Sequence, residues 1–183
     1  MSGDYSRKRF NPEKHYQGVL RQQGRVDLDA DWNEYVDLQD RRWRAETIDV
    51  VGRSGVPDET PDGFKIAVSG GELTVGQGRM YVDGYVAENH GTAPAFEPTL
   101  EEGYGTAALP VKNQPYGGPV TVPAQVRSLV YLDVWRREVT HLQAPDLIEP
   151  AVNVDSTTRY QTAWQVRVLA NIPPDITCDT PLS

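Results

Sequence analysis

The chain has 183 residues, of which 38 % are hydrophobic and 24 % are charged, so it can form one domain with a core of modest size. Its net charge of −8 argues against nucleic-acid binding as the main function. A single cysteine excludes an intramolecular disulfide, and no apolar run is long enough to span a bilayer. The 16 Gly and 14 Pro residues predict a β-rich protein with many loops.

The first 25 residues form a basic segment in an otherwise acidic protein. They hold two acidic residues, Asp4 and Glu13, against Arg7, Lys8, Arg9, Lys14, Arg21 and Arg25. Such a segment is either a solvated arm or an anchor on an acidic partner surface, and the sequence leaves both interpretations open.

One long helix is predicted from Asp31 to Val51. Asp31 and Glu34 have the spacing of a capping box, and Gly52 follows as a stop signal. Large apolar side chains recur near one face at helical spacing: Trp32, Val36, Trp43 and Ile48, with Tyr35 at the edge. A stripe with two tryptophans needs a partner, which is either the body of this domain or another chain.

Short β-strands are predicted after a loop at 53–63. The clearest pair, 79–82 and 85–88, is joined by Asp83-Gly84, the signature of a two-residue type I′ hairpin. Further strands are expected at 64–68, 72–75, 128–139 and 162–171. In the strand at 128–139, one set of alternating residues is expected to face the core: Val130, Leu132, Val134 and Arg136.

The predicted fold class is α+β. An N-terminal arm and one long helix (1–52) form the expected docking region, and a mainly antiparallel β-rich domain with long loops (53–171) follows. Residues 89–126 and 145–160 are expected to be loops, and 172–183 an irregular tail.

Motifs for catalysis or metal binding are incomplete. Asp27, Asp29 and Asp31 alternate like the first ligands of a calcium loop, but Trp32 and Leu38 stand where that loop needs Gly and Glu. We prefer a structural interpretation in which Leu28 and Trp32 are buried and the acidic residues flank them. Gly76 and Gly78 lack the third glycine of a dinucleotide loop, and Cys178 has no obvious base beside it. We therefore expect no enzyme activity, no cofactor and no metal site.

The four tryptophans fall into two groups. Trp135 and Trp164 lie in predicted strands and are expected in the core. Trp32 and Trp43 lie on the predicted helix beside the basic arm, and they are candidates for a protein–protein surface.

The sequence leading into the helix resembles the opening of an uncharacterised bacterial family. The resemblance rests on Gly3-Asp4-Tyr5-Ser6-Arg7 and on His15-Tyr16-x-Gly18-Val19-Leu20-x-Gln22-Gln23-Gly24-Arg25-Val26-x-Leu28-Asp29-Ala30-Asp31-Trp32-Asn33-Glu34. Later blocks also fit, among them Gly78-Arg79-x-Tyr81-Val82-Asp83-Gly84 and Tyr131-Leu132-Asp133-Val134-Trp135. The family is associated with contractile injection systems and phage-tail-like particles, and no catalytic residue comes with the resemblance.

The resemblance implies a structural assembly component of such a particle, at the baseplate, spike or fibre attachment. Interaction through the arm and helix is expected to use Arg7, Arg9, Tyr16, Arg25, Trp32, Tyr35 and Trp43. The expected partners are other subunits of the particle and further copies of this chain, without nucleic acid and without membrane insertion. We expect cytoplasmic assembly into the particle, with release from the cell left open.

One alternative function and one expectation about chain length accompany this interpretation. A β-rich body with exposed aromatic and acidic residues also suits a carbohydrate-binding or carbohydrate-processing module. Longer relatives continue past a segment similar to Cys178-Asp179-Thr180-Pro181, so we expect that the natural chain could extend beyond Ser183.

Overall fold

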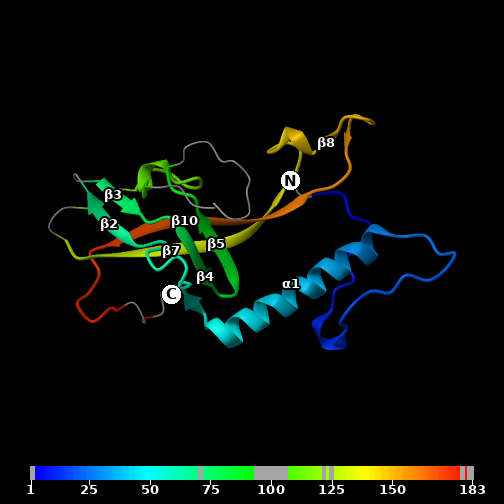
Figure 1. Ribbon diagram of the computed structural model, residues 1–183, viewed down its shortest axis with the longest axis horizontal. Helices are drawn as coiled ribbons and strands as arrows, with labels where there is room; N and C mark the ends of the chain where they lie inside the picture. The colour runs from blue at the N-terminus through cyan, green and yellow to red at the C-terminus, as the bar shows by residue number, and fades with distance from the viewer. Residues whose placement is uncertain are drawn as a thin grey trace. The chain divides into compact units, whose positions relative to one another are not determined.

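The computed structural model describes residues 3–69, 72–92, 107–120, 123, 126–177 and 180. It divides into two compact units, each made of two chain segments. Unit 1 joins Met1–Arg53 to Arg136–Gln161, and unit 2 joins Ser54–Trp135 to Thr162–Ser183. Among the described residues, one α-helix and several antiparallel sheets confirm the α+β class with a β-rich majority (Figure 1).

Unit 1 is built around helix α1, Asp29–Val51, which follows the short 3-10 helix η1, Pro12–Lys14. The helix begins two residues before the predicted start, and the N-cap residue Leu28 offers no side-chain hydrogen bond. The predicted capping box is therefore wrong. The Asp31 carboxylate lies inside the first turn instead, where it forms an ion pair with Arg9 of the N-terminal arm. We define the N-terminal arm as residues 3–28.

The C-terminal end of α1 follows the prediction. Gly52 adopts φ 93°, which favours glycine, and its N–H donates a hydrogen bond of 2.9 Å to the carbonyl oxygen of Ile48. The last helical carbonyl groups are thereby partly satisfied.

The face that α1 buries differs from the predicted stripe. The helix buries Ala30 and Leu38, whereas Trp32 is 62 % exposed and Trp43 is 66 % exposed. Leu28 is exposed as well, so the expectation that Leu28 and Trp32 are buried is wrong. Polar contacts made by α1 help to determine which side of it faces inward, because Asp31 and Asp40 are both held by arginines of unit 1.

The two longest strands, β7 (Ser128–Val139) and β10 (Arg159–Ala170), pair with each other and pass through both units. The bounds of β7 agree with the prediction, and β10 begins three residues before the predicted Thr162. The segment between them, predicted as a connecting loop, contains further regular structure: η3 (Pro145–Leu147), β8 (Ile148–Glu149) and β9 (Val154–Asp155).

Unit 2 contains two small antiparallel sheets. The first has the order β1-β4-β5, with β1 at Ser54–Gly55, β4 at Gly78–Val82 and β5 at Tyr85–Asn89. The second has the order β2-β3-β6, with β2 at Ile66–Ser69, β3 at Glu72–Val75 and β6 at Leu109–Pro110. The expected loop at 89–126 thus contains β6 and the 3-10 helix η2, Val111–Asn113, and its residues 93–106, 121–122 and 124–125 lie outside the described residues.

The predicted hairpin is confirmed. Val82 pairs with Tyr85, and the two residues between them, Asp83 and Gly84, have φ 48° and 80°. Positive φ at both central residues is what a type I′ turn requires. By contrast, β2 starts two residues after the predicted Phe64, because Phe64 itself adopts φ 58° and leaves the extended conformation.

The core of unit 2 gathers side chains from both sheets and from the long strands: Phe64, Val75, Ala87, Val111, Trp164 and Val166. Val130, Leu132 and Val134 pack against it, which confirms the predicted inner side of β7. The Trp164 ring meets Phe64 edge to face at 5.0 Å between centroids. Its Nε1–H donates to the carbonyl oxygen of Glu88 at 2.7 Å, so the buried indole has no unpaired polar atom.

Trp135, the other tryptophan expected in the core, is half-buried and meets Tyr116 with 5.9 Å between ring centroids. The described part of the expected tail is held by Arg127, whose guanidinium donates to the carbonyl oxygens of Pro173 and Ile176 at 3.0 Å each. Its backbone is irregular, as predicted.

Candidate docking surface

The acidic residues considered as calcium ligands are each engaged by a different side chain. Asp27 pairs with Arg21 at 3.3 Å, the Asp29 carboxylate accepts hydrogen bonds from Ser6, and Asp31 pairs with Arg9. In the described part of the chain, no group of three or more His, Cys, Asp or Glu side chains is placed to hold a metal ion. Cys178 lies outside the described residues.

The N-terminal arm is attached to the strand ends of unit 1. The Tyr5 hydroxyl and the Gly3 N–H both donate to one carboxylate oxygen of Glu138, each at 2.6 Å. The Tyr5 hydroxyl also shares a hydrogen bond with the Thr158 hydroxyl. The bond from Tyr5, with the weaker one from Gly3, lowers the pKa of Glu138, because hydrogen bonds to a carboxylate favour its charged form.

Glycine leaves room for side chains where the arm meets these residues. A Cβ on Gly3 would lie 2.8 Å from the Tyr5 ring and 2.9 Å from the Thr158 methyl group. Both distances are far inside ordinary van der Waals contact. The glycine in the Gly3-Asp4-Tyr5 sequence therefore has a local structural reason.

A second attachment joins the arm to the start of α1. The N–H and hydroxyl of Ser6 donate to the two carboxylate oxygens of Asp29 at 2.8 and 2.6 Å. These bonds lower the pKa of Asp29, since they favour the ionised carboxylate. Together with the pair between Arg9 and Asp31, they place part of the basic arm beside the acidic first half of the helix.

The middle of α1 is tied to the strand ends. Arg136 pairs with Asp40 at 2.7 Å, and its guanidinium lies 4.2 Å from the centroid of the Tyr160 ring. Partial burial raises the pKa of Asp37, although the positive charge of Arg136 opposes this shift. Arg136 was expected to face the core, and it instead connects the helix to β10 within unit 1.

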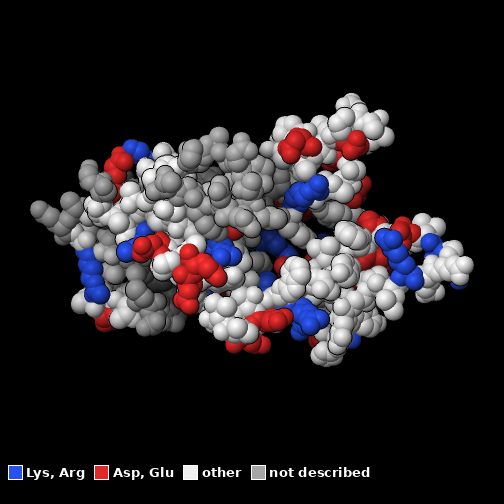
Figure 2. Space-filling model, viewed as in Figure 1, with Lys and Arg blue, Asp and Glu red and all other residues white. Residues whose placement is uncertain are grey.

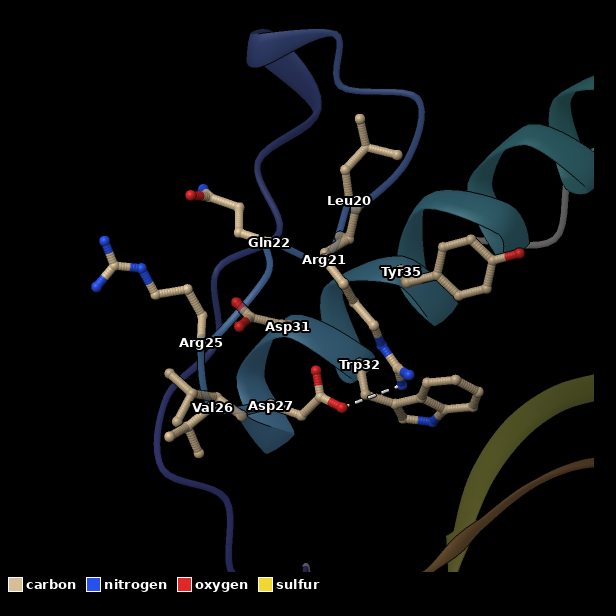
Figure 3. A pocket seen from close by; sticks show the side chains of 11 residues that line it. Leu20, Arg21, Gln22, Arg25, Val26, Asp27, Asp31, Trp32 and Tyr35 are labelled. Atoms are coloured by element: carbon tan, nitrogen blue, oxygen red, sulfur yellow. Dashed lines mark ion pairs between the residues drawn. The ribbon is translucent and has the colours of Figure 1, made fainter.

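Beyond these attachments, the loop before α1 and the first turns of the helix enclose an open hollow of about 640 Å³ (Figure 3). Its apolar lining includes Leu20 and Val26 from the loop and Trp32 and Tyr35 from the helix. We call these four residues the docking surface. Leu20 is 92 % exposed, Val26 83 %, Trp32 62 % and Tyr35 40 %.

Charged side chains border the docking surface. Arg21 reaches Asp27 beside Trp32, while the guanidinium of Arg25 points away from both (Figure 3). On the other side, Trp32 also lines a smaller hollow of about 260 Å³ together with Glu34 and Asp37. Acidic and basic side chains are interspersed over the face of the molecule drawn in Figure 2. The Trp32 indole therefore lines two hollows that charged side chains also line.

The expected interaction residues fall into four groups. Arg25, Trp32 and Tyr35 line the large hollow, and Arg9 lines the small one while paired with Asp31. Tyr16 is 55 % exposed, lies under the Lys14 ammonium at 5.7 Å, and lines a third hollow with Phe10 and Leu38. Arg7 and Trp43 are exposed and line none of these three hollows.

Sequence reasoning missed Leu20 and Val26. Leu20 follows Val19, and Val26 stands two residues before Leu28, in an otherwise polar segment. These short apolar groups are too few to establish the period of a buried face. The available signal was their place inside the block that resembles a known family. Periodicity could not find them because the loop has no regular structure.

Unit 1 buries little apolar surface of its own. Among its described residues, the buried hydrophobic side chains are Ala30, Leu38 and Val139. Further large apolar side chains of the unit are exposed, including Trp43, Val50, Leu142 and Val152. None of the helices in the described ranges has the length and apolar character of a membrane span.

Comparison with known proteins identifies a family. The sequence model of a family of unknown function, DUF6519, matches residues 1–178. No curated protein and no solved structure matches the chain. Inference about function therefore depends on the surfaces described above.

Proposed function

The chain belongs to DUF6519, a family of unknown function, and from that premise we propose that it is a structural assembly component acting by protein–protein docking through unit 1. The proposed setting is a contractile injection system or phage-tail-like particle, at the baseplate, spike or fibre attachment. This setting follows from the resemblance of the sequence blocks quoted above. Assembly in the cytoplasm is part of the proposal, and catalysis is not.

The observation that carries the proposal is the exposure of the docking surface. Leu20, Val26, Trp32 and Tyr35 line one hollow, and the first three of them remain largely uncovered by their own chain. Contiguous exposed apolar residues with polar borders are typical of protein–protein interfaces, where Trp and Tyr carry much of the binding energy. Covering one such side chain is worth about 1.5–3 kcal/mol.

Preorganisation of the arm supports the same function. Bonds from Tyr5 to Glu138, from Ser6 to Asp29 and from Arg9 to Asp31 hold the arm beside α1 before any partner arrives. Binding to an ordered surface loses less conformational entropy than binding to a mobile one. The arm therefore contributes to docking even where its charges are already paired within the chain.

A carbohydrate-binding module is the second candidate, and one observation favours it. The hollow combines the exposed Trp32 ring with the carboxylate of Asp27 and the amide of Gln22. An aromatic platform beside a few polar groups is a common arrangement in small-molecule sites. In this case a purified monomer would bind glycans, and Trp32→Ala would abolish that binding.

Particle incorporation tests the docking function. High-mass material from source cells is pelleted, imaged by electron microscopy and searched for this chain by mass spectrometry, with a deletion strain beside it. In the complemented strain, Trp32→Ala with Trp43→Ala should reduce incorporation by roughly 30-fold or more, because loss of an interface tryptophan costs about 2 kcal/mol or more. Unit 2 should remain folded, since its core is built from other residues.

Leu142→Ala is the matched control, because Leu142 is also an exposed apolar residue of unit 1 and does not line the hollow. It should be incorporated like the wild type. Normal incorporation of the double tryptophan variant would contradict the proposed docking function. A wild-type chain that stays in the soluble fraction while particles look intact would do the same.

A further inference from the structure

We propose that the docking surface binds a second copy of this chain about a two-fold axis, so that the same four residues meet on both sides of the contact. This inference rests on the proposed docking function and names the occupant of the surface. An isologous contact requires one patch that is complementary to itself, with a projecting group and a receiving hollow on the same protomer.

The shape of the surface meets this requirement. Leu20 projects from the loop before α1 and is 92 % exposed. The same loop and the first turns of α1 border a hollow of about 640 Å³ that includes the rings of Trp32 and Tyr35 in its lining. Two copies related by a two-fold axis can therefore each place Leu20 in the hollow of the other.

The charges around the surface point to the same occupant. Arg21 pairs with Asp27 and Arg9 pairs with Asp31. The other charged residues that line the two hollows include Lys8, Asp37 and Arg159, and the opposite charges considered for the contact are Arg25 and Glu34. Within the described ranges, neither of these two side chains forms a hydrogen bond or an ion pair. Arg25 lines the large hollow with its guanidinium directed away from Trp32 (Figure 3), and Glu34 lines the small one. The two opposite charges therefore lie at the two hollows that Trp32 shares.

A copy related by a two-fold axis would provide an opposite charge for both Arg25 and Glu34. Arg25 of each protomer would face Glu34 of its partner, because an isologous contact repeats every pairing in reverse. A partner surface carrying a single sign of charge would neutralise one of these residues and repel the other. Opposite charges placed in this way mainly determine which partner is accepted and in which orientation.

The scarcity of buried apolar residues in unit 1 adds a reason for self-association. Its described residues bury only Ala30, Leu38 and Val139 among the hydrophobic side chains. A dimer contact would cover Leu20, Val26, Trp32 and Tyr35 in each copy, and this apolar burial would favour the associated state. The contact would thus add buried apolar surface to unit 1, which has a small core by itself.

Charge exchange between the protomers tests the proposal. The full chain and its variants are purified and their mass is measured by sedimentation equilibrium and by light scattering after gel filtration. The wild type should be a dimer. Arg25→Glu and Glu34→Arg should each raise the dimer dissociation constant at least about tenfold, since each creates two like-charge contacts per dimer.

The decisive result comes from combining the two changes. An equimolar mixture of the Arg25→Glu and Glu34→Arg chains should form a heterodimer, because each reversed charge then faces its opposite. The double variant carrying both substitutions should again form a homodimer. Recovery by mixing also shows that the single variants are folded, so a folding defect cannot imitate the expected pattern.

Leu20→Asp should abolish the dimer, and Val152→Asp is its matched control, because Val152 is 62 % exposed in unit 1 away from the hollow. A monomeric wild type, or single charge variants that dimerise like the wild type, would overturn the proposal. If the wild type is monomeric while the tryptophan variants still fail to enter particles, docking stands and its partner is a different subunit. If the wild type is monomeric and the tryptophan variants also enter particles normally, both the dimer and the docking function are wrong.

Discussion

Glu138 is the residue on which the attachment of the N-terminal arm depends most directly. One of its carboxylate oxygens accepts hydrogen bonds from the Gly3 N–H and from the Tyr5 hydroxyl. The pKa of Glu138 is lowered chiefly by the bond from Tyr5, and the pKa of Asp29 is lowered by the bonds from Ser6. Both carboxylates therefore favour the attached arm in their ionised form.

The sign of the pH dependence follows from these shifts. A carboxyl group whose pKa is lowered in the folded state stabilises that state above its unfolded pKa, which is about 4 for Asp and Glu. The contribution disappears as the pH falls through the lowered folded value. We expect the arm to loosen below about pH 4 and to be fully attached at neutral pH.

Glu138→Gln should loosen the arm already at neutral pH. The neutral amide is a weaker acceptor for the two donors, and the expected loss is about 0.5 kcal/mol because water partly screens this half-buried site. Amide exchange of residues 3–9, followed by NMR between pH 3 and 7, should be faster in the variant and less dependent on pH.

Asp155→Asn is the matched control for this measurement. Asp155 is a carboxylate of unit 1 that pairs with His141 at 2.7 Å and has no contact with the arm among its hydrogen bonds or ion pairs. Its removal should leave exchange in residues 3–9 unchanged. Equal exchange in the wild type and in Glu138→Gln would mean that the carboxylate does not hold the arm.

The β4–β5 hairpin shows how a single element depends on its turn. Asp83 and Gly84 both have positive φ, and Val82 and Tyr85 pair directly outside the turn. Gly84→Ala places a Cβ in the left-handed region, which costs roughly 1–2 kcal/mol. Urea denaturation of the variant, followed by circular dichroism, should therefore show a lower midpoint than that of the wild type.

Gly118→Ala is the control for the turn. A Cβ at Gly118 meets no atom within 4 Å, and Gly118 is not among the glycines with positive φ. This substitution should leave the midpoint close to the wild-type value. Equal midpoints for Gly84→Ala and Gly118→Ala would contradict the assignment of the turn as the sensitive point of the hairpin.

In helix α1, contacts with other segments modify what the local sequence favours. Its first half contains only acidic charged residues, Asp29, Asp31, Glu34, Asp37 and Asp40, while arginines follow in the second half. Acidic residues near a helix N-terminus are favourable by themselves. Here Ser6, Arg9 and Arg136 bind three of them, so the start and the middle of the helix are tied to other segments of unit 1.

At the scale of the whole molecule, the two units differ in the size of their buried core. Unit 2 has one apolar cluster built around Phe64, Val75 and Trp164, whereas the described part of unit 1 buries few hydrophobic residues. Local opening is easier where few apolar contacts are buried. In hydrogen exchange, amides of α1 should therefore exchange sooner than those of β3 and β5.

Hydrogen exchange of the Leu20→Asp variant separates the stability of unit 1 itself from the protection that a dimer contact would add. If a dimer covers the docking surface, protection of the first half of α1 should fall in this variant and protection of unit 2 should not change. Mass spectrometry of peptic peptides gives the exchange of both units in one sample. Equal protection of α1 and of β3 and β5 in the variant would contradict the difference in stability between the units.

Several features of this protein were determined by the sequence itself, because they depend on neighbouring residues. Strand β7, its inner side with Val130 and Val134, the Asp83-Gly84 turn and the stop at Gly52 follow from spacing and backbone preference. Local propensity specifies such features wherever no distant contact competes with it. The buried position of Trp164 follows in the same way from its strand.

Tertiary structure alone decided the features on which docking depends. The bonds from Gly3 and Tyr5 to Glu138 join residues more than 130 positions apart, and they bring segment 136–161 to the arm and helix in unit 1. Periodicity in α1 showed that an apolar stripe needs a partner but not which surface supplies it. The partner of each side chain depends on contacts between distant segments, and Trp32 is exposed because those contacts favour the face with Leu38.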